Sequence, residues 1–132
     1  GTYAGNAVSC AAAVEVLKTF KREDVLTNVK AREKQLFEAL NKIKEDLSTK
    51  GAIVDVRGRG LMVGVEFAEG EGVPKNIAKR VADKCIEKGL LILTTSVFQV
   101  IRFIPALNIT QEDLAKGCAI FEEALKDVVR EG

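Results

Sequence analysis

Apolar positions recur along the chain with two different periods, and this change of period divides the chain into helices and strands. Spacings of three and four residues predict helices over 7–20, 25–48 and 74–88 and after Thr110. Alternation and short apolar runs predict strands over 53–57, 61–67, 90–93 and 97–104. Because helices and strands do not alternate strictly along the chain, this order predicts an α+β fold. We expect a small, largely antiparallel sheet of three to four strands covered by helices.

One predicted strand carries a charged residue among large apolar ones. Within 97–104, the period of two puts Arg102 on one face of the strand. The other residues of that face are Phe98, Val100 and Ile104. A guanidinium among such neighbours is unfavourable unless an anion pairs with it, and that anion could belong to the protein or to a ligand. Alternatively, Arg102 is a strand-end arginine that reaches water or a nearby glutamate, as most arginines do.

The chain opens with a turn-prone stretch, residues 1–6, that leads into the first predicted helix. It contains two glycines, a threonine and an asparagine. Backbone N–H groups and the hydroxyl of Thr2, close to a helix start, can hold a phosphate. By itself the stretch is more simply a plain loop in which Asn6 caps the helix.

Local signals predict where the other elements begin and end. Asp24 is expected to cap the second helix and Pro74 to occupy the first turn of the third. Thr110 opens a sequence that resembles a capping box. Residues 49–51 are expected to end the second helix, and residues 94–96 to turn into the last strand.

Length and charge narrow the classes of partner. The chain has 132 residues, which suits one domain. Its 20 basic and 19 acidic residues leave a net charge of +1, so electrostatics give no support for a nucleic-acid or anionic-membrane partner. No apolar run approaches the roughly 20 residues of a membrane span, and we expect no membrane partner.

The cysteine and histidine contents restrict the chemistry. Cys10, Cys85 and Cys118 are odd in number, far apart in the sequence and without a CxxC pair. This pattern predicts buried free thiols in a reducing, cytoplasmic compartment. The chain has no histidine, which removes imidazole metal ligands and Ser-His-Asp triads, and we expect no metal site.

Several motifs occur in an order that resembles a known family. They are Gly1–Ala7, Asp55–Met62, Lys88–Leu90, Val100–Pro105 and Leu107–Thr110. In order and approximate spacing they resemble the C-terminal part of class III pyridoxal-phosphate-dependent aminotransferases, most of all the 4-aminobutyrate aminotransferases. The resemblance implies the C-terminal small domain of a fold-type I aminotransferase over 1–132. A phosphate-contacting loop and a connecting helix would occupy about 1–24.

The resemblance also implies roles for two residues. In similar enzymes the threonine of the first motif binds the cofactor phosphate in the partner subunit's site, which implies this role for Thr2 and a homodimer for the full-length enzyme. The arginine of the strand motif binds the substrate carboxylate, which implies this role for Arg102. The implied cofactor is pyridoxal phosphate. The implied substrates are 4-aminobutyrate, or a related ω-amino acid, and a 2-oxo acid.

The family's Schiff-base lysine, and the acidic residue that pairs with the cofactor's pyridine nitrogen, lie upstream of the opening motif. We therefore expect a fragment with no catalytic residue of its own, without covalently bound cofactor and inactive alone. No lysine here, Lys84 for example, is assigned the covalent role. Two other interpretations stay open: a freestanding α+β amino-acid-binding regulatory module using Arg102, and a structural or dimerisation domain whose glycines serve packing.

Overall fold

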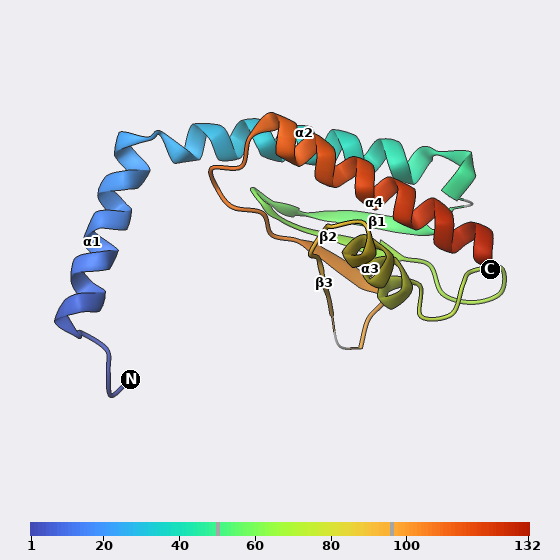
Figure 1. Cartoon of the computed structure of the whole chain (residues 1–132), viewed down its shortest axis with the longest axis horizontal. Helices are drawn as coiled ribbons and strands as arrows, with labels where there is room; N and C mark the ends of the chain where they lie inside the picture. The colour runs from blue at the N-terminus through green and yellow to red at the C-terminus, as the bar shows by residue number, and fades with distance from the viewer. Residues whose placement is uncertain (50, 96) are drawn as a thin grey trace.

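Helices pack on one face of a four-stranded sheet in the computed structural model, which describes residues 1–49, 51–95 and 97–132 (Figure 1). The helices are α1 (Ala7–Arg22), α2 (Val25–Glu45), α3 (Ile77–Glu87) and α4 (Gln111–Glu131). The strands are β1 (Ile53–Arg59), β2 (Met62–Phe67), β3 (Leu93–Thr94) and β4 (Val100–Phe103). The parts expected of Lys50 and Ser96, in ending the second helix and in the turn before β4, lie outside the described residues.

The strands are ordered β1-β2-β4-β3, and each neighbouring pair is antiparallel. The predicted α+β fold with a small antiparallel sheet is therefore confirmed. A tight turn at residues 60–61 joins β1 to β2, and β1 requires glycine at position 58, opposite Val63. Gly58 has φ +152°, and an added Cβ would lie 2.1 Å from the carbonyl oxygen of Met62. A side chain at this position would thus force the hairpin apart.

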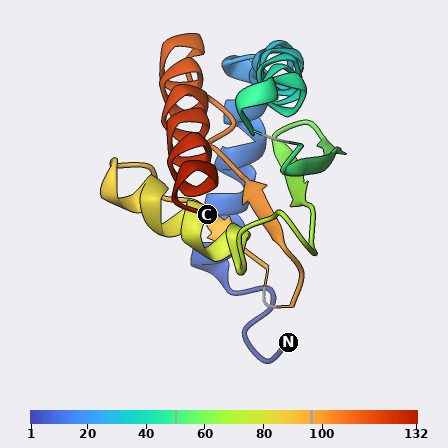
Figure 2. The ribbon, with the colours of Figure 1, turned by 90° about the vertical axis from the view of Figure 1, so that its right-hand side faces the viewer.

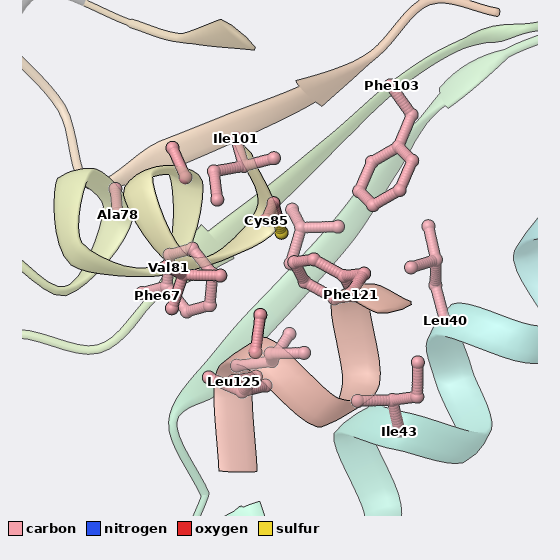
Figure 3. Close-up of a cluster of buried hydrophobic side chains, with 14 of the residues drawn as sticks. Leu40, Ile43, Phe67, Ala78, Val81, Cys85, Ile101, Phe103, Phe121 and Leu125 are labelled. Atoms are coloured by element: carbon pink, nitrogen blue, oxygen red, sulfur yellow. The ribbon is translucent and has the colours of Figure 1, made fainter. Parts of the chain in front are cut away.

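The core lies between the sheet and the three helices α2, α3 and α4 (Figures 2 and 3). Phe121 of α4 is at its centre and is fully buried. Its ring meets the ring of Phe103 edge-on at 5.0 Å between centroids and lies 6.5 Å from that of Phe67. Burial of each such side chain contributes about 1.5–3 kcal/mol, so this cluster fixes the helices on the sheet.

Helix α1 extends away from this packed body (Figure 1). None of its residues is buried, and the apolar Val8, Val14 and Leu17 are exposed. Asn6 caps the helix as expected: its Oδ1 accepts the N–H groups of Val8 at 3.0 Å and Ser9 at 3.2 Å. Local capping thus forms α1, while packing within the described residues contributes little to it.

The starts of α2 and α3 differ from the sequence prediction, and in both cases the residue before the helix has a positive φ. Asp24 and Asn76 have φ of +48° and +54°, in the left-handed region. An N-cap that accepts hydrogen bonds has extended φ and ψ, so the side chain of Asp24 makes no capping bond to α2. The left-handed Asn76 separates Pro74 from α3, which therefore begins at Ile77, and the first-turn role of Pro74 is wrong.

Other local signals were partly right. Thr110 caps α4, since its Oγ1 accepts the N–H of Asp113 at 3.1 Å. The strand expected over 90–93 is wrong in length and burial. Only Leu93–Thr94 pairs with β4, at the edge of the sheet, and the side chain of Leu93 is exposed. An edge strand has one neighbour to pair with, so an apolar run there need not be buried.

The three cysteines are free thiols in two different environments. Cys85 and Cys118 are buried, and burial raises the pKa of each thiol to about 11. Cys10 is exposed on α1, so the expectation that it is buried is wrong. The helix that carries it has no packed side within the described residues.

Candidate functional site

The two faces of the sheet differ completely in their surroundings. Ile101 and Phe103 point from β4 into the core and are 0% and 7% exposed, while Arg102 between them is exposed. The predicted alternation is confirmed over Val100–Phe103, while the strand expected from Val97 begins only at Val100. We call the side away from the helices the open face. Its residues include Asp55, Arg57, Arg59, Met62, Gly64, Glu66, Leu93, Val100 and Arg102.

A single row across the open face places two arginines on either side of a glycine. Gly64 of β2 pairs with Arg57 of β1 on one side and with Arg102 of β4 on the other. Leu93 of the edge strand is the next residue in the row. Because Gly64 has no side chain, the surface between the two arginines stays low. A Cβ at this position would lie 3.6 Å from Cγ1 of Val100, an ordinary contact.

Arg57 is engaged by two carboxylates on the same face. Its Nη1 lies 2.8 Å from Oδ2 of Asp55 and also contacts the carboxylate of Glu66. The hydrogen bonds that Arg57 donates to Asp55 first, and then to Glu66, raise the pKa of Arg57, while the Arg57 guanidinium lowers the pKa of Asp55. These side chains are about half exposed, so the pairs are screened by water and stabilise the fold weakly.

Arg102 has no such partner in the part of the chain that the structure describes. Its guanidinium takes part in none of the ion pairs or side-chain hydrogen bonds found there. Glu66 on the neighbouring strand and Asp55 one strand further both contact Arg57 already. Arg102 therefore reaches solvent, one of the two situations that the sequence left open. Its planar fork of donors remains able to bind a carboxylate in two parallel hydrogen bonds.

Thr2 lies in a separate place, in the turn that precedes α1. The turn is closed by the N–H of Ala4 donating to the carbonyl of Gly1 at 2.9 Å, and Thr2 is exposed. No hydrogen bond of its hydroxyl occurs among the described residues. Because α1 carries this turn away from the sheet, Thr2 and Arg102 do not form one site within one chain (Figure 1).

Sequence reasoning missed the cluster of Asp55, Arg57 and Glu66. A signal was present: Asp55 and Arg57 are two residues apart in one strand, and Glu66 alternates with core residues of the next. The cluster depends, however, on a register irregularity between Ile53 and Asp55, which pairs Asp55 with Glu66. Such an irregularity has no reliable marker in the sequence.

Neither a cluster of metal ligands nor a helix suited to cross a membrane occurs within 1–49, 51–95 and 97–132. No group of three or more cysteine or acidic side chains is arranged to hold a metal ion in these ranges. None of the helices described is long and apolar enough to cross a bilayer.

Comparison with known proteins gives the geometry a context. The profile of the family described as aminotransferase class-III matches residues 1–125. An acetylornithine aminotransferase of Clostridium acetobutylicum is 40% identical over 126 residues, covering 95% of this chain and 30% of that protein. A 5-aminovalerate aminotransferase of Pseudomonas aeruginosa is 37% identical over 132 residues, covering 97% and 30%.

Solved structures agree with these sequence relatives. The adenosylmethionine-8-amino-7-oxononanoate aminotransferase of Methanocaldococcus jannaschii superposes with a TM-score of 0.81 at 34% identity, covering 97% of this chain and 29% of that one. The N-acetylornithine aminotransferase of Stenotrophomonas maltophilia gives 0.81 at 30% identity, covering 97% and 33%. The chain thus spans about 30% of the length of the curated relatives it matches. The names of these proteins specify different amino donors, so the resemblance to 4-aminobutyrate enzymes in particular is not confirmed.

Proposed function

The chain belongs to the class-III aminotransferases, and on that premise we propose that it is the C-terminal part of a pyridoxal-phosphate-dependent enzyme. The enzyme would transfer the amino group of 4-aminobutyrate, or of a related ω-amino acid, to a 2-oxo acid. One observation carries the proposal. The open face of the sheet presents a guanidinium, that of Arg102, that no carboxylate of the described residues engages.

In this proposal Arg102 binds the substrate carboxylate. An ω-amino acid has its carboxylate and its reacting amine at opposite ends of a short chain. A bidentate contact at Arg102 would fix one end and the direction of the other, so the amine is presented at a defined distance from the sheet. The strand supports this role, because Ile101 and Phe103 anchor β4 in the core on both sides of Arg102.

Thr2 is proposed to bind the cofactor phosphate. Its hydroxyl is exposed in a turn just before the N-terminus of α1, where a donor and the helix dipole can both face an anion. When bound, pyridoxal phosphate supplies the electron sink that amino transfer requires. Because α1 extends away from the body, the turn would reach a neighbouring subunit in the proposed enzyme. This supports a homodimer in which Thr2 serves the partner's site.

The remaining parts of the proposal follow from the same assignment. Residues 1–132 would form the small domain, with the phosphate-contacting loop and connecting helix in about 1–24. The chain would contribute no catalytic residue, and the Schiff-base lysine would come from a preceding segment of the enzyme. Three free thiols support a reducing, cytoplasmic location.

The test compares the complete protein that contains this segment with the 132-residue chain alone. Each is supplied with pyridoxal phosphate, 2-oxoglutarate and one donor from 4-aminobutyrate, 5-aminovalerate and N-acetylornithine, and glutamate formation is measured. We expect the complete protein to turn over, fastest with 4-aminobutyrate or 5-aminovalerate, and the isolated chain to be inactive. Turnover by the isolated chain would contradict the fragment assignment. A complete protein that binds these amino acids without transferring the amine would favour a regulatory binding module instead.

A further inference from the structure

The open face holds two arginines in equivalent positions, yet only one of them is available to an anion. Arg57 and Arg102 are both in register with Gly64, one strand away on either side. Two strand spacings put their backbones about 10 Å apart. Arg57 is engaged by Asp55 and Glu66, and Arg102 by no carboxylate of the described residues.

We propose that Asp55 and Glu66 hold Arg57 out of substrate binding, so that the row through Gly64 offers one anion site, at Arg102, and a dicarboxylate can bind along this row through one end only. This inference rests on the proposed function, because it takes Arg102 as the carboxylate site. Asp55, Glu66 and Arg57 are then determinants of specificity that do not contact the substrate in the native protein.

Without the two acids, the same row would form a site for two anions. Both guanidinium groups would stand on one face, and position 64 between them, a glycine, contributes no side chain. A five-carbon dicarboxylate such as glutarate has the length to engage both forks at once. Its second contact would then be intramolecular and would strengthen binding beyond that of either contact alone. A monocarboxylate such as valerate would gain no second contact.

Removing the negative charge of the two acids also strengthens anion binding in general, and this contribution can be separated from that of the second contact. The acids and Arg57 together carry one net negative charge near Arg102, so neutralising both acids makes the face more attractive to any anion. That general gain applies to each carboxylate, and at an ionic strength of about 0.15 M it is screened beyond roughly 8 Å. The ratio of glutarate affinity to valerate affinity removes the part that acts on any single carboxylate. This ratio is therefore the quantity to measure.

The experiment uses the complete protein with Asp55→Asn and Glu66→Gln together, and measures the dissociation constants of glutarate and valerate by calorimetry. We expect the ratio to shift toward glutarate by about threefold to fivefold, the size of one exposed ionic contact. Adding Arg57→Ala to this variant should return the ratio most of the way to its native value, because the second contact is then lost. Glu66→Gln alone, which leaves Arg57 with Asp55, should shift the ratio in the same direction by less, and it remains informative if the double variant does not fold.

A matched control removes two acids elsewhere. Asp83→Asn with Glu123→Gln changes the net charge equally but acts on helical ion pairs, with Lys79 and Lys88. The inference is overturned if this control shifts the ratio as much, if Asp55→Asn/Glu66→Gln leaves the ratio unchanged, or if Arg57→Ala fails to reverse it. Failure of the proposed function looks different: in that case Arg102→Ala leaves the affinity for valerate itself unchanged.

Discussion

The two faces of the sheet are built from alternate residues of the same strands, and they do different work. On the covered face, Ile101 and Phe103 are buried against the helices, and Phe121 packs edge-on against Phe103. On the open face, Arg102 lies between them in sequence and contacts no carboxylate of the residues that the structure describes. A shift of pairing by one residue would exchange the two sets. The apolar residues therefore fix both the fold and the side on which the arginine emerges.

The largest effect is expected on the covered face. Phe121→Ala removes a fully buried ring that contacts both Phe67 and Phe103 and leaves a cavity at the centre of the core. We expect it to lower the free energy of unfolding by about 3–5 kcal/mol, measured by urea denaturation. Arg102→Ala is the control from the open face and should change it by less than about 0.5 kcal/mol.

This comparison assumes that the chain unfolds cooperatively by itself, since its core is made by its own three helices and sheet. A broad, noncooperative melt with near-ultraviolet signals already lost would show instead that the body needs the rest of the enzyme to pack. Equal losses for Phe121→Ala and Arg102→Ala would show that Arg102 is a structural residue.

On the open face the expected effect is on substrate binding. In the complete enzyme, Arg102→Ala should lower kcat/KM for carboxylate substrates by about 100-fold, because it removes two charge-assisted hydrogen bonds. Arg102→Lys should lose about tenfold, since an ammonium keeps the charge without the planar fork.

An amine donor that has no carboxylate provides the internal control for this prediction. It never uses the contact, so its kcat/KM should change little in either variant. If both kinds of donor lost activity equally in Arg102→Ala, with the protein still folded, the assignment of Arg102 to the carboxylate would be wrong.

Much of this division between faces could be predicted from the sequence, because the signal lies in neighbouring residues. The period of two in 97–104 requires only neighbouring residues, and it separated Arg102 from Ile101 and Phe103 correctly. The helix order, and the capping by Asn6 and Thr110, are equally local and are confirmed.

The features that sequence reasoning missed depend on contacts far apart in the chain or on single backbone angles. The burial of the 90–93 run could not be judged without knowing that β3 is an edge strand. The prediction that Asp24 caps α2 was wrong because Asp24 has a positive φ. The Arg57 cluster required the register of β1 against β2, which places Glu66 within reach. Whether Arg102 would find a protein carboxylate was therefore open until that register was known.

Thr2 lies on neither face of the sheet, and it separates cofactor binding from the binding of the substrate carboxylate. Thr2→Ala, in the complete enzyme, should weaken the affinity for pyridoxal phosphate by about tenfold through loss of one hydrogen bond to a charged oxygen. It should leave KM for the carboxylate substrate unchanged once the cofactor is saturating. The dissociation constant is obtained by cofactor titration followed by absorbance. An unchanged constant would leave Thr2 as an ordinary residue of the turn.

The smallest expected effect is on the pH dependence of stability, through an ion pair between the end of α2 and helix α4. Asp46 lies just after α2, where the Nζ of Lys126 on α4 is 2.9 Å from Oδ2 and the N–H of Ser48 donates to Oδ1 at 2.8 Å. These contacts, the one with Lys126 first, hold the pKa of Asp46 well below its usual range. The folded chain therefore keeps this carboxylate ionised at a pH where the unfolded chain, with an aspartate pKa of about 3.9, is already protonated.

A group whose pKa is lower in the folded state contributes stability above its unfolded pKa and loses that contribution as the pH falls toward its folded pKa. The urea midpoint of the native chain should therefore fall between about pH 5 and pH 2, and Asp46→Asn should make this fall shallower while lowering the midpoint slightly near pH 7. Arg102→Ala, which removes a charge that no acid of the described residues engages, should leave the slope as it is. Because the Asp46 pair is partly exposed, its effect should also shrink in about 1 M salt, where screening shortens to roughly 3 Å. An Asp46→Asn variant with the native acid slope would show that α2 and α4 are held together by their buried apolar residues alone.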